Sequence, residues 1–590
     1  MEKWMVAAKK ADFARWSEKF QIDQVLARII RNRDVETEEE VAKFLQGTMD
    51  DCYLPWLLQG MKQGVELLQR EIVRGSNIRV IGDYDVDGVC STYILTEGLR
   101  QLGAKVDTAI PHRMKDGYGL NDNLIHEAYE AGVQCIVTCD NGIAAAPQVA
   151  LAKELGMKVV ITDHHEVPFE ECEGVKKEIL PPADVIIDPK QAACEYPFKS
   201  ICGGVVAYKF IQALCQQMQY TRSKELLREL LPFAAMATVC DVMELKDENR
   251  IIVKSGLRLM DSTSNQGLKA LFEVNGLEPG KITAFHLGFV IGPCLNATGR
   301  LDTALRALEL LQAKDRAEAI TLATELKEMN DSRKNLTLQG LEEAEKQIRE
   351  QELFKDNVML VYLPQVHESL AGIIAGRIRE KYHHPVFVLT DGEEGIKGSG
   401  RSIESYHMYD SMVEVKQYFT KFGGHKLAAG LSMDRENLEA LRKALNEKAK
   451  LTEEDFIPKV HIDVPMPMEY ANYNLAKELE RLEPYGVGNP KPLFAQKDIS
   501  FMEAKRIGAN GNYAKFTVEM MPGGYPRKTD LMYFGDVDAF CTFLDEKYGA
   551  GSADHLFAGD KSYLLSITYQ IGINSFRGRE SLQYIMQNYC

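Results

Sequence analysis

Between residue 78 and about residue 245, short runs of apolar residues alternate with longer stretches in which apolar residues recur every three or four positions. The short runs have the length and β-branched composition of buried strands, and the longer stretches have the spacing of amphipathic helices. Strands that alternate with helices in this way predict a parallel sheet with helical crossovers. The predicted strands are residues 78–81, 106–110, 134–138, 158–162 and 184–187.

The rest of the chain divides by its pattern into further segments, and together they predict an α/β fold. Residues 1–70 form a polar, helix-favouring lead-in to the first α/β domain, which we place at 71–302. Residues 303–352 contain almost no glycine or proline and predict one long connecting helix, with a hairpin of two helices as an alternative. Residues 353–452 alternate strand and helix again, as in a second α/β domain. Residues 453–590 contain short alternating strands typical of an OB-like β-barrel.

Polar side chains follow the strands of the first domain at the points where those strands end. Because the carboxyl ends of parallel strands meet at one edge of a sheet, we expect these side chains to lie close together. Carboxylates at such spacing repel one another unless a cation lies among them. Carboxylates with one or two imidazoles suit Mn²⁺ or Mg²⁺ better than a thiolate-seeking ion. The residues of this cluster are Asp83, Asp85, Asp87, Asp140, Asp163, His164, His165 and Asp241.

Composition narrows the class of protein. The apolar fraction of 45% and charged fraction of 26% are those of an ordinary globular protein. The formal net charge of −16 argues against a protein that coats duplex nucleic acid, but it is compatible with a narrow basic channel. The sequence has no leader-like start and no apolar run long enough to span a bilayer, so we expect a cytoplasmic protein with no membrane partner. The 12 cysteines form no CxxC pair, which is typical of reduced thiols.

Four motifs in this order resemble those of the DHH phosphoesterase family. They are the segments 83–88, 139–142 and 163–165, followed by Asp241. The resemblance implies a site for two ions, Mn²⁺ or Mg²⁺. By position, it assigns Asp85 and Asp140 to one ion, and Asp87, Asp140, His164 and Asp241 to the other, with Asp140 shared.

The same resemblance assigns two catalytic residues beside the ions. His165 would contact the scissile phosphate, and Asp163 would orient the imidazoles. The chain departs from the family pattern at Ile81, where many members carry a histidine four residues before the first metal-binding Asp. Either the first ion is held more weakly for this reason, or Asp83 compensates as an additional ligand.

Glycine-containing pieces of the second α/β domain offer backbone amides, hydroxyls and cations to a phosphate. They lie at 367–372, 397–402 and 422–430, and together they resemble the DHH-associated domain of the family. The order of domains resembles that of the family members that degrade single-stranded DNA from its 5′ end. This resemblance assigns Arg113, Ser399 and Arg401 to the 5′-terminal phosphate, Asn296 and the catalytic Arg300 to the backbone beside the metals, and His367 and His425 to the lining of the site.

Aromatic and basic residues are interleaved in the predicted barrel. Such residues could stack on the bases of a single strand and neutralise its phosphates. For Phe516, a place in the core is the better interpretation. The residues are Tyr513, Lys515, Phe516, Arg527, Lys528 and Tyr533.

We therefore expect a two-metal-dependent 5′-to-3′ exonuclease that hydrolyses single-stranded DNA to 5′-mononucleotides in DNA repair and recombination. The resemblance also implies a monomer, with single-strand-binding protein and a RecQ-type helicase as candidate partners. One alternative is a DHH phosphodiesterase for short oligonucleotides or dinucleotides, against which the barrel argues because such substrates need no extended track. A second is an inactive scaffold of the same fold, against which the complete set of metal-binding residues argues.

Overall fold

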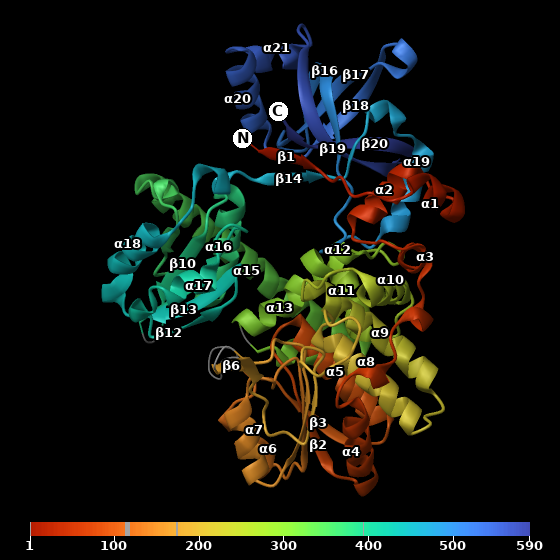
Figure 1. Ribbon diagram of the computed structural model, residues 1–590, viewed down its shortest axis with the longest axis vertical. Coiled ribbons are helices and arrows are strands. Elements are labelled where there is room, and N and C mark those ends of the chain that lie inside the picture. The colour runs from red at the N-terminus through yellow and green to blue at the C-terminus, as the bar shows by residue number, and fades with distance from the viewer. Residues whose placement is uncertain (1, 113–118, 173–174, 302, 393–394, 577) are drawn as a thin grey trace. The chain divides into compact units, whose positions relative to one another are not determined.

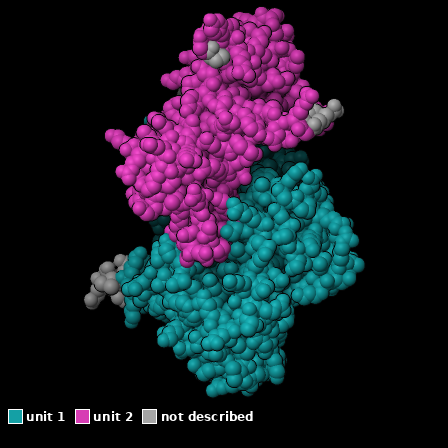
Figure 2. Space-filling model, turned by 90° about the vertical axis from the view of Figure 1, so that its right-hand side faces the viewer, with its two compact units in different colours: residues 1–2, 53–243, 255–458 teal, residues 3–52, 244–254, 459–590 magenta. Residues whose placement is uncertain are grey.

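The computed structural model divides into two compact units, which we describe separately (Figure 2). Unit 1 consists of residues 1–2, 53–243 and 255–458, and unit 2 of residues 3–52, 244–254 and 459–590. Among the described helices, none combines the length and the apolar character needed to cross a membrane. The residues that the structure describes are 2–112, 119–172, 175–301, 303–392, 395–576 and 578–590.

The first sheet of unit 1 is parallel and has the strand order β3-β2-β4-β5-β8, as the alternating pattern predicts. Helices α6 (Asp122–Glu130) and α7 (Ala146–Glu154) pack on one face of this sheet. Helices α4 (Met61–Arg74), α5 (Val86–Gln101) and α8 (Gly203–Gln217) pack on the other (Figure 1). The strands are β2 (Asn77–Ile81), β3 (Lys105–Ala109), β4 (Cys135–Cys139), β5 (Lys158–Thr162) and β8 (Val185–Ile187), and a separate hairpin is formed by β6 (Phe169–Cys172) and β7 (Val175–Glu178).

The order of the strands reverses at β2. The chain passes from β2 to β3 on one side and later returns to β4 on the other side of β2. Open α/β sheets place their ligands where the strand order reverses in this way. The fold therefore directs the loops that follow β2 and β4 towards one site.

Helices fill the middle of the chain. Helix α15 (Arg316–Glu350) is a single element of 35 residues, which confirms the expected long connecting helix and excludes the hairpin. It begins later than residue 303, because α14 (Leu305–Gln312) is a separate helix. The other helices here are α9 (Ser223–Cys240), α10 (Asp247–Met260), α11 (Gln266–Val274), α12 (Ala284–His286) and α13 (Gly292–Leu301).

The second α/β domain, after α15, is built on a mixed sheet of order β12-β13-β11-β10-β9. Helix α16 (Glu368–Tyr382) packs on β10 and β11. The fold class expected for this part of the chain is therefore confirmed. The remaining elements are β9 (Met359–Tyr362), β10 (Val386–Asp391), β11 (Ile396–Arg401), β12 (Lys421–Gly424), β13 (Ala428–Met433), α17 (Met408–Val413) and α18 (Leu438–Lys448).

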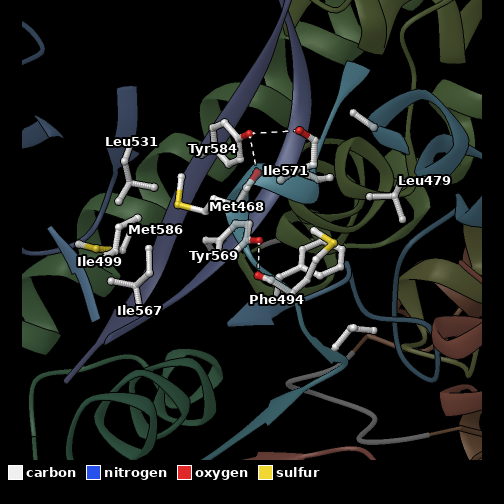
Figure 3. Packing of buried hydrophobic residues seen from close by; sticks show 14 of the residues in the cluster. Met468, Leu479, Phe494, Ile499, Leu531, Ile567, Tyr569, Ile571, Tyr584 and Met586 are labelled. Atoms are coloured by element: carbon white, nitrogen blue, oxygen red, sulfur yellow. Dashed lines mark hydrogen bonds between the residues drawn. The ribbon is translucent and has the colours of Figure 1, made fainter. Parts of the chain in front are cut away.

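Unit 2 contains the predicted barrel, which closes because β16 pairs with both β17 and β19. Buried aromatic and aliphatic side chains fill it, and the hydroxyl of Tyr569 donates to the carbonyl of Met466 at 2.7 Å (Figure 3). The elements are β15 (Val464–Pro465), β16 (Phe494–Ile507), β17 (Tyr513–Met520), β18 (Arg527–Tyr533), β19 (Tyr563–Phe576), β20 (Arg579–Tyr589), α19 (Tyr473–Leu479), α20 (Val537–Tyr548) and α21 (Ser552–Ala558).

Residues 3–52 of the N-terminal lead-in belong to the same unit as the barrel. Strand β1 (Lys3–Val6) pairs in parallel with β14 (Lys459–Ile462). Apolar residues of the N-terminal helices share one hydrophobic core with the barrel. Local pattern in the sequence does not indicate this pairing of the two ends of the chain. The helices are α1 (Phe13–Phe20), α2 (Gln24–Asn32) and α3 (Glu38–Gln46).

The aromatic residues predicted to face a nucleic acid on the barrel divide between core and surface. Phe516 is fully buried, in agreement with its interpretation as core, and Tyr533 is 6% exposed, so the prediction that Tyr533 could stack on a base is wrong. Tyr533 is buried because strand alternation places it on the same face of β18 as the buried Leu531. Tyr513 is exposed on β17 and packs edge-on against Phe534.

Arg250 ties three segments of unit 2 together. Arg250 is 1% exposed, and its guanidinium donates to the carbonyl of Phe44 at 2.9 Å. It also donates to the carbonyls of Leu482 at 2.7 Å, Arg481 at 3.0 Å and Glu483 at 2.9 Å. Buried carbonyls that lose their donor cost free energy, so this one side chain carries much of the local stability.

We expect the substitution Arg250→Met to lower the free energy of unfolding of unit 2 by about 3 kcal/mol, because it leaves several buried carbonyls without a donor. Trp4 and Trp16 lie in unit 2 and Trp56 lies in unit 1. In a Trp56→Phe background, tryptophan fluorescence during urea unfolding therefore reports on unit 2. Arg527→Met, which replaces an exposed arginine on β18 of the same unit, is the control and should change the midpoint little. Equal midpoints for both variants would contradict this role of Arg250.

Candidate metal centre

The first acidic motif folds back on itself between β2 and α5. Asp85 is the N-cap of α5, and its carboxylate accepts the backbone N–H of Gly88 at 3.0 Å. A side chain at Gly88 would collide with the carbonyl of Asp83, so glycine is required there. Asp83 is 1% exposed, in the turn before the helix. The motif therefore presents Asp83 and Asp85 from one tight turn.

Asp87 is held by the first turn of a distant helix. Its two carboxylate oxygens accept the backbone N–H groups of Gly203 and Gly204, each at 2.7 Å, at the start of α8. A helix N-terminus favours negative charge, so α8 stabilises the ionised carboxylate in a fixed orientation. A Cβ at residue 203 would lie 2.8 Å from the Cβ of Asp140, and this close approach requires glycine.

We expect Gly203→Ala to lower the affinity for Mn²⁺ by about 10–100-fold, the usual cost of disturbing groups that support metal ligands. The added methyl group would displace Asp140 and the amides that hold Asp87. Titration calorimetry with Mn²⁺ measures the change. The control is Gly376→Ala in α16, where no atom would lie within 4 Å of the new Cβ. Unchanged affinity in Gly203→Ala would show that the site tolerates this displacement.

Asp140 and His164 form the centre of the cluster. Asp140 follows β4 in a left-handed conformation, with φ of 60°, a strained geometry that often marks functional sites. The Nε2 atom of His164 lies 3.0 Å from Asp140, 3.4 Å from Asp87 and 3.7 Å from Asp241, measured to carboxylate oxygens. One imidazole nitrogen thus faces carboxylates that come from β4, α5 and the end of α9. The structure therefore brings these four predicted residues together.

Asp163 organises the pair of histidines. Its Oδ1 atom accepts the backbone N–H of His164 at 2.7 Å and the Nδ1–H of His165 at 2.8 Å, while its Oδ2 atom accepts the backbone N–H of Ile143 at 2.9 Å. Burial alone would raise the pKa of Asp163, but these hydrogen bonds and the histidines hold it below its ordinary value. Asp163 is therefore an ionised, fully used acceptor that fixes the ring of His165.

The other carboxyl groups are crowded together with little to offset their charge. Burial and the charge of Asp85 raise the pKa of Asp83 to about 8, and burial and the charge of Asp87 raise the pKa of Asp241 to about 8. Burial and neighbouring carboxylates also raise the pKa values of Asp85 and Asp140. The Oδ1 atom of Asp83 is buried and has no hydrogen-bond partner among the described residues. Bound cations would neutralise the negative charge of these crowded carboxylates.

The donors fit divalent ions that prefer oxygen. Within the described part of the chain, three groups of side chains offer ligand atoms that lie within 4.8 Å of one another. Carboxylate oxygens with imidazole nitrogens are a donor set that suits Mn²⁺ or Mg²⁺. The groups are Asp83, Asp85 and Asp140; Asp87, His164 and Asp241; and Asp140, His164 and His165.

The helix that carries Asn296 and Arg300 lies against the first acidic motif. A Cβ at Gly299 of α13 would approach the carbonyl of Tyr84 to 2.6 Å, so the helix and the loop are in close contact. Asn296 is half-buried, and Arg300 donates from Nη1 to the carbonyl of Ser369 at 2.6 Å. The helix that carries both residues therefore lies next to the first acidic motif.

Ser399 and Arg401 converge in the second α/β domain. They alternate along β11, and both side chains reach Gly372 of α16, where a Cβ would lie 2.9 Å from Nη2 of Arg401 and 3.4 Å from Oγ of Ser399. His367 caps α16 at its exposed N-terminus. His425 lies in the exposed turn between β12 and β13, and Arg113 lies outside the described residues.

Sequence reasoning assigned no role to two features of the site. One is the pair Gly203 and Gly204, whose amides hold Asp87. The other is Asn141, which is buried and donates from Nδ2 to the carbonyls of Ile81 at 3.2 Å and Cys139 at 3.0 Å, so that it ties β2 to β4 below the cluster. The available signals were a Gly-Gly pair at a helix start and an amide directly after a metal-binding aspartate.

Family models match three segments of the chain. The model of the DHH family N-terminal domain matches residues 77–238, that of the DHHA1 domain residues 355–451, and that of the RecJ OB domain residues 462–588. The first match contains every residue of the metal cluster except Asp241. The second contains Ser399 and Arg401, and the third covers the closed barrel.

Relatives match over most of the chain. The single-stranded-DNA-specific exonuclease RecJ of Salmonella typhimurium is 33% identical over 96% of this chain and 95% of its own length. The protein of that name from Bacillus subtilis is 36% identical over 85% of this chain, and the match spans only 62% of that longer relative. The crystal structure of RecJ in complex with Mn²⁺ from Thermus thermophilus superposes with a TM-score of 0.81 at 26% identity, covering 100% of this chain and 79% of that one.

Proposed function

This chain belongs to the RecJ family of DHH phosphoesterases, and we propose that it is a metal-dependent exonuclease that hydrolyses single-stranded DNA. The observation that carries the proposal is the convergence of Asp87, Asp140 and Asp241 on one nitrogen of His164. The closed barrel supports this function over the alternative of a phosphodiesterase for dinucleotides. The relatives that match over most of this chain bear the name single-stranded-DNA-specific exonuclease.

Two ions, Mn²⁺ or Mg²⁺, would be held by the clustered carboxylates. Asp85 and Asp140 would hold one ion, and Asp87, Asp140, His164 and Asp241 the other. When bound, such ions neutralise phosphate oxygens and lower the pKa of water, which supplies the nucleophile without a protein base. The unpartnered oxygen of Asp83 supports a role for this residue as the additional ligand in place of the histidine that Ile81 replaces.

The residues around the ions would orient the phosphate. His165, fixed by its hydrogen bond to Asp163, would contact the scissile phosphate. Arg300 and Asn296 project from a helix that lies against the metal-binding loop, and they would hold the DNA backbone there. Held in this way, a phosphodiester would be presented in one orientation for attack.

Ser399 and Arg401, with Arg113, would bind the 5′-terminal phosphate, and His367 and His425 would line this side of the site. The half-buried position of Arg401 beside Ser399 and Gly372 supports this assignment, because a guanidinium and a hydroxyl with nearby glycine suit a phosphate. A pocket for the 5′ phosphate would impose 5′-to-3′ polarity and the release of 5′-mononucleotides.

We expect Arg401→Ala to reduce kcat/KM on 5′-phosphorylated single strands by about 10–100-fold, the cost of one charge-assisted contact of about 1.5–3 kcal/mol. The same variant should change cleavage of 5′-hydroxyl strands little. Arg435→Ala, an exposed arginine in the same domain, is the control. If both kinds of strand lose activity equally in Arg401→Ala, the arginine does not recognise the 5′ phosphate.

The function itself is tested with single strands labelled at either end, in Mn²⁺ or in EDTA. Metal-dependent release of mononucleotides from the 5′ end supports the proposal. Activity on dinucleotides but not on long strands would favour the alternative, and no activity with any divalent ion would favour an inactive scaffold.

We also propose that the protein acts in the cytoplasm as a monomer in DNA repair and recombination, with single-strand-binding protein and a RecQ-type helicase as partners. Family resemblance supports this proposal. Co-purification of tagged protein from cells, with and without nuclease treatment, tests whether these partners bind directly or through shared DNA.

A further inference from the structure

Two exposed phenylalanines, Phe285 and Phe289, form a stacked pair. Their side chains are 61% and 69% exposed, and their ring centroids lie 5.0 Å apart with an angle of 25° between the planes. Singly exposed apolar residues are ordinary, but two large rings stacked in the open form a surface that is suited to a ligand. We call this pair the aromatic platform.

An unusual backbone segment supports the aromatic platform. Residues Leu287–Ile291 form a π-helical segment. This geometry is rare in proteins overall, but where it occurs it often lies at a functional site. Leu287 and Ile291 are fully buried and anchor the segment, so Phe285 and Phe289 are left on its open side. The platform is therefore rigidly supported from below.

The supported segment lies against the end of α9, where the metal cluster begins. The thiol of Cys240 donates to the carbonyl of Leu287 at 3.5 Å, and a Cβ at Gly288 would lie 3.6 Å from Val239. The residue after Cys240 is Asp241, which faces His164 in the cluster. The segment that carries the platform therefore lies against the end of α9, next to Asp241.

The residue after Asp241 is unusual as well. Val242 has a φ of 58°, which a β-branched residue adopts only under strain, and its side chain is 66% exposed. Strain of this kind persists where the surrounding structure enforces it and clusters at functional sites. The residue directly after Asp241 is thus an exposed apolar side chain on a strained backbone.

The other end of the segment leads directly into α13, which carries Asn296 and Arg300. The platform lies in the chain between this helix and the contact with α9. The segment that carries the platform thus contacts both α9, which leads to Asp241, and α13. Because the platform is continuous in the chain with the helix that carries the proposed DNA-backbone-binding residues, we take single-stranded DNA as the ligand of the platform.

We propose that the aromatic platform stacks on a nucleobase of the single strand beside the scissile phosphate, an inference that rests on the proposed function. Phosphates directed to the metal centre leave their bases at its edge, where an aromatic face can cover them. Stacking suits every base because each has a π face, so the contact would bind DNA without sequence preference. It would also require an unpaired base, since a paired base is already stacked within its duplex.

The test uses the double variant Phe285→Leu/Phe289→Leu, which keeps the surface apolar but removes the rings. On a 5′-phosphorylated thymidine strand we expect kcat/KM to fall about 10–100-fold, the cost of losing base stacking. On the same strand with abasic nucleotides at its 5′ end, the wild type and the variant should cleave equally. Phe354→Leu, which replaces another exposed phenylalanine of unit 1, should match the wild type on both strands.

Binding gives a second readout. In an Asp140→Asn background, 2-aminopurine near the 5′ end should be quenched on binding, and the leucine pair should abolish the quenching. Wild-type kinetics for the double variant on the thymidine strand would overturn the inference, as would equal losses on the thymidine and abasic strands. A wild type that cleaves neither strand would refute the proposed function, and the platform's role would fall with it.

Discussion

Replacing Asp140 with asparagine should abolish exonuclease activity, by about 10³-fold or more in kcat, while making the metal-free protein more stable. Asp140 is the carboxylate shared by two of the ligand groups, so its loss affects both proposed ions. A loss of this size corresponds to about 4 kcal/mol of transition-state stabilisation, which is the scale expected for metal-ion catalysis. Activity is measured on 5′-phosphorylated single strands in Mn²⁺.

The expected gain in stability distinguishes the loss of a metal ligand from simple misfolding. Burial and the charges of its neighbours raise the pKa of Asp140, so without metal its ionised form is unfavourable. A neutral amide of the same shape removes that cost, and the melting temperature of the metal-free variant should exceed that of the wild type. Simple misfolding would lower both activity and stability.

A surface carboxylate provides the control. Asp107 lies in the same sheet, forms an ion pair with Arg79 and has a side chain that is 54% exposed. Asp107→Asn should leave activity and metal binding unchanged. If Asp140→Asn retains a tenth of the wild-type activity, Asp140 is not the shared ligand.

The parallel sheet and the position of its site were predictable because both depend on local pattern. Runs such as 158–162 are apolar and β-branched, and the acidic residues follow directly in the chain. Once the strands are parallel, their carboxyl ends must meet, so Asp140 and His164 come together without further information. The burial of Phe516 in the barrel core was predictable for the same reason, since alternation along the strand places this residue inside.

Contacts between segments far apart in the sequence were not predictable. The amide of Gly203 reaches Asp87 across 116 residues, and no spacing in the chain encodes that approach. Likewise, Arg250 finds its acceptors in two other segments of unit 2. The prediction for Tyr533 failed because an aromatic residue among basic ones resembles a nucleic-acid-binding surface. The apolar residue two positions earlier, on the same face of the strand, was the better guide to its burial.

The affinity of the metal-free protein for Mn²⁺ should rise steeply with pH, by about 10²- to 10⁴-fold between pH 6 and pH 8. The pKa values of Asp83 and Asp241 are raised to about 8 without metal, so below that pH both carboxyls carry protons. An ion binds their deprotonated forms, and each proton displaced contributes a factor of about 10 per pH unit. Calorimetry in buffers of different ionisation enthalpy counts these protons directly.

Stability should show the opposite sign. A carboxyl whose pKa is higher in the folded state than in the unfolded chain, where it is about 3.9, destabilises the fold as pH rises from about 4 to about 8. The metal-free protein should therefore lose stability across this window, and saturating Mn²⁺ should remove most of the loss. Asp83→Asn should release fewer protons on metal binding and flatten the stability profile, because one of the two titrating carboxyls is gone. An affinity independent of pH would mean that these carboxylates are already ionised without metal, and that their crowding alone is no reason to place cations among them.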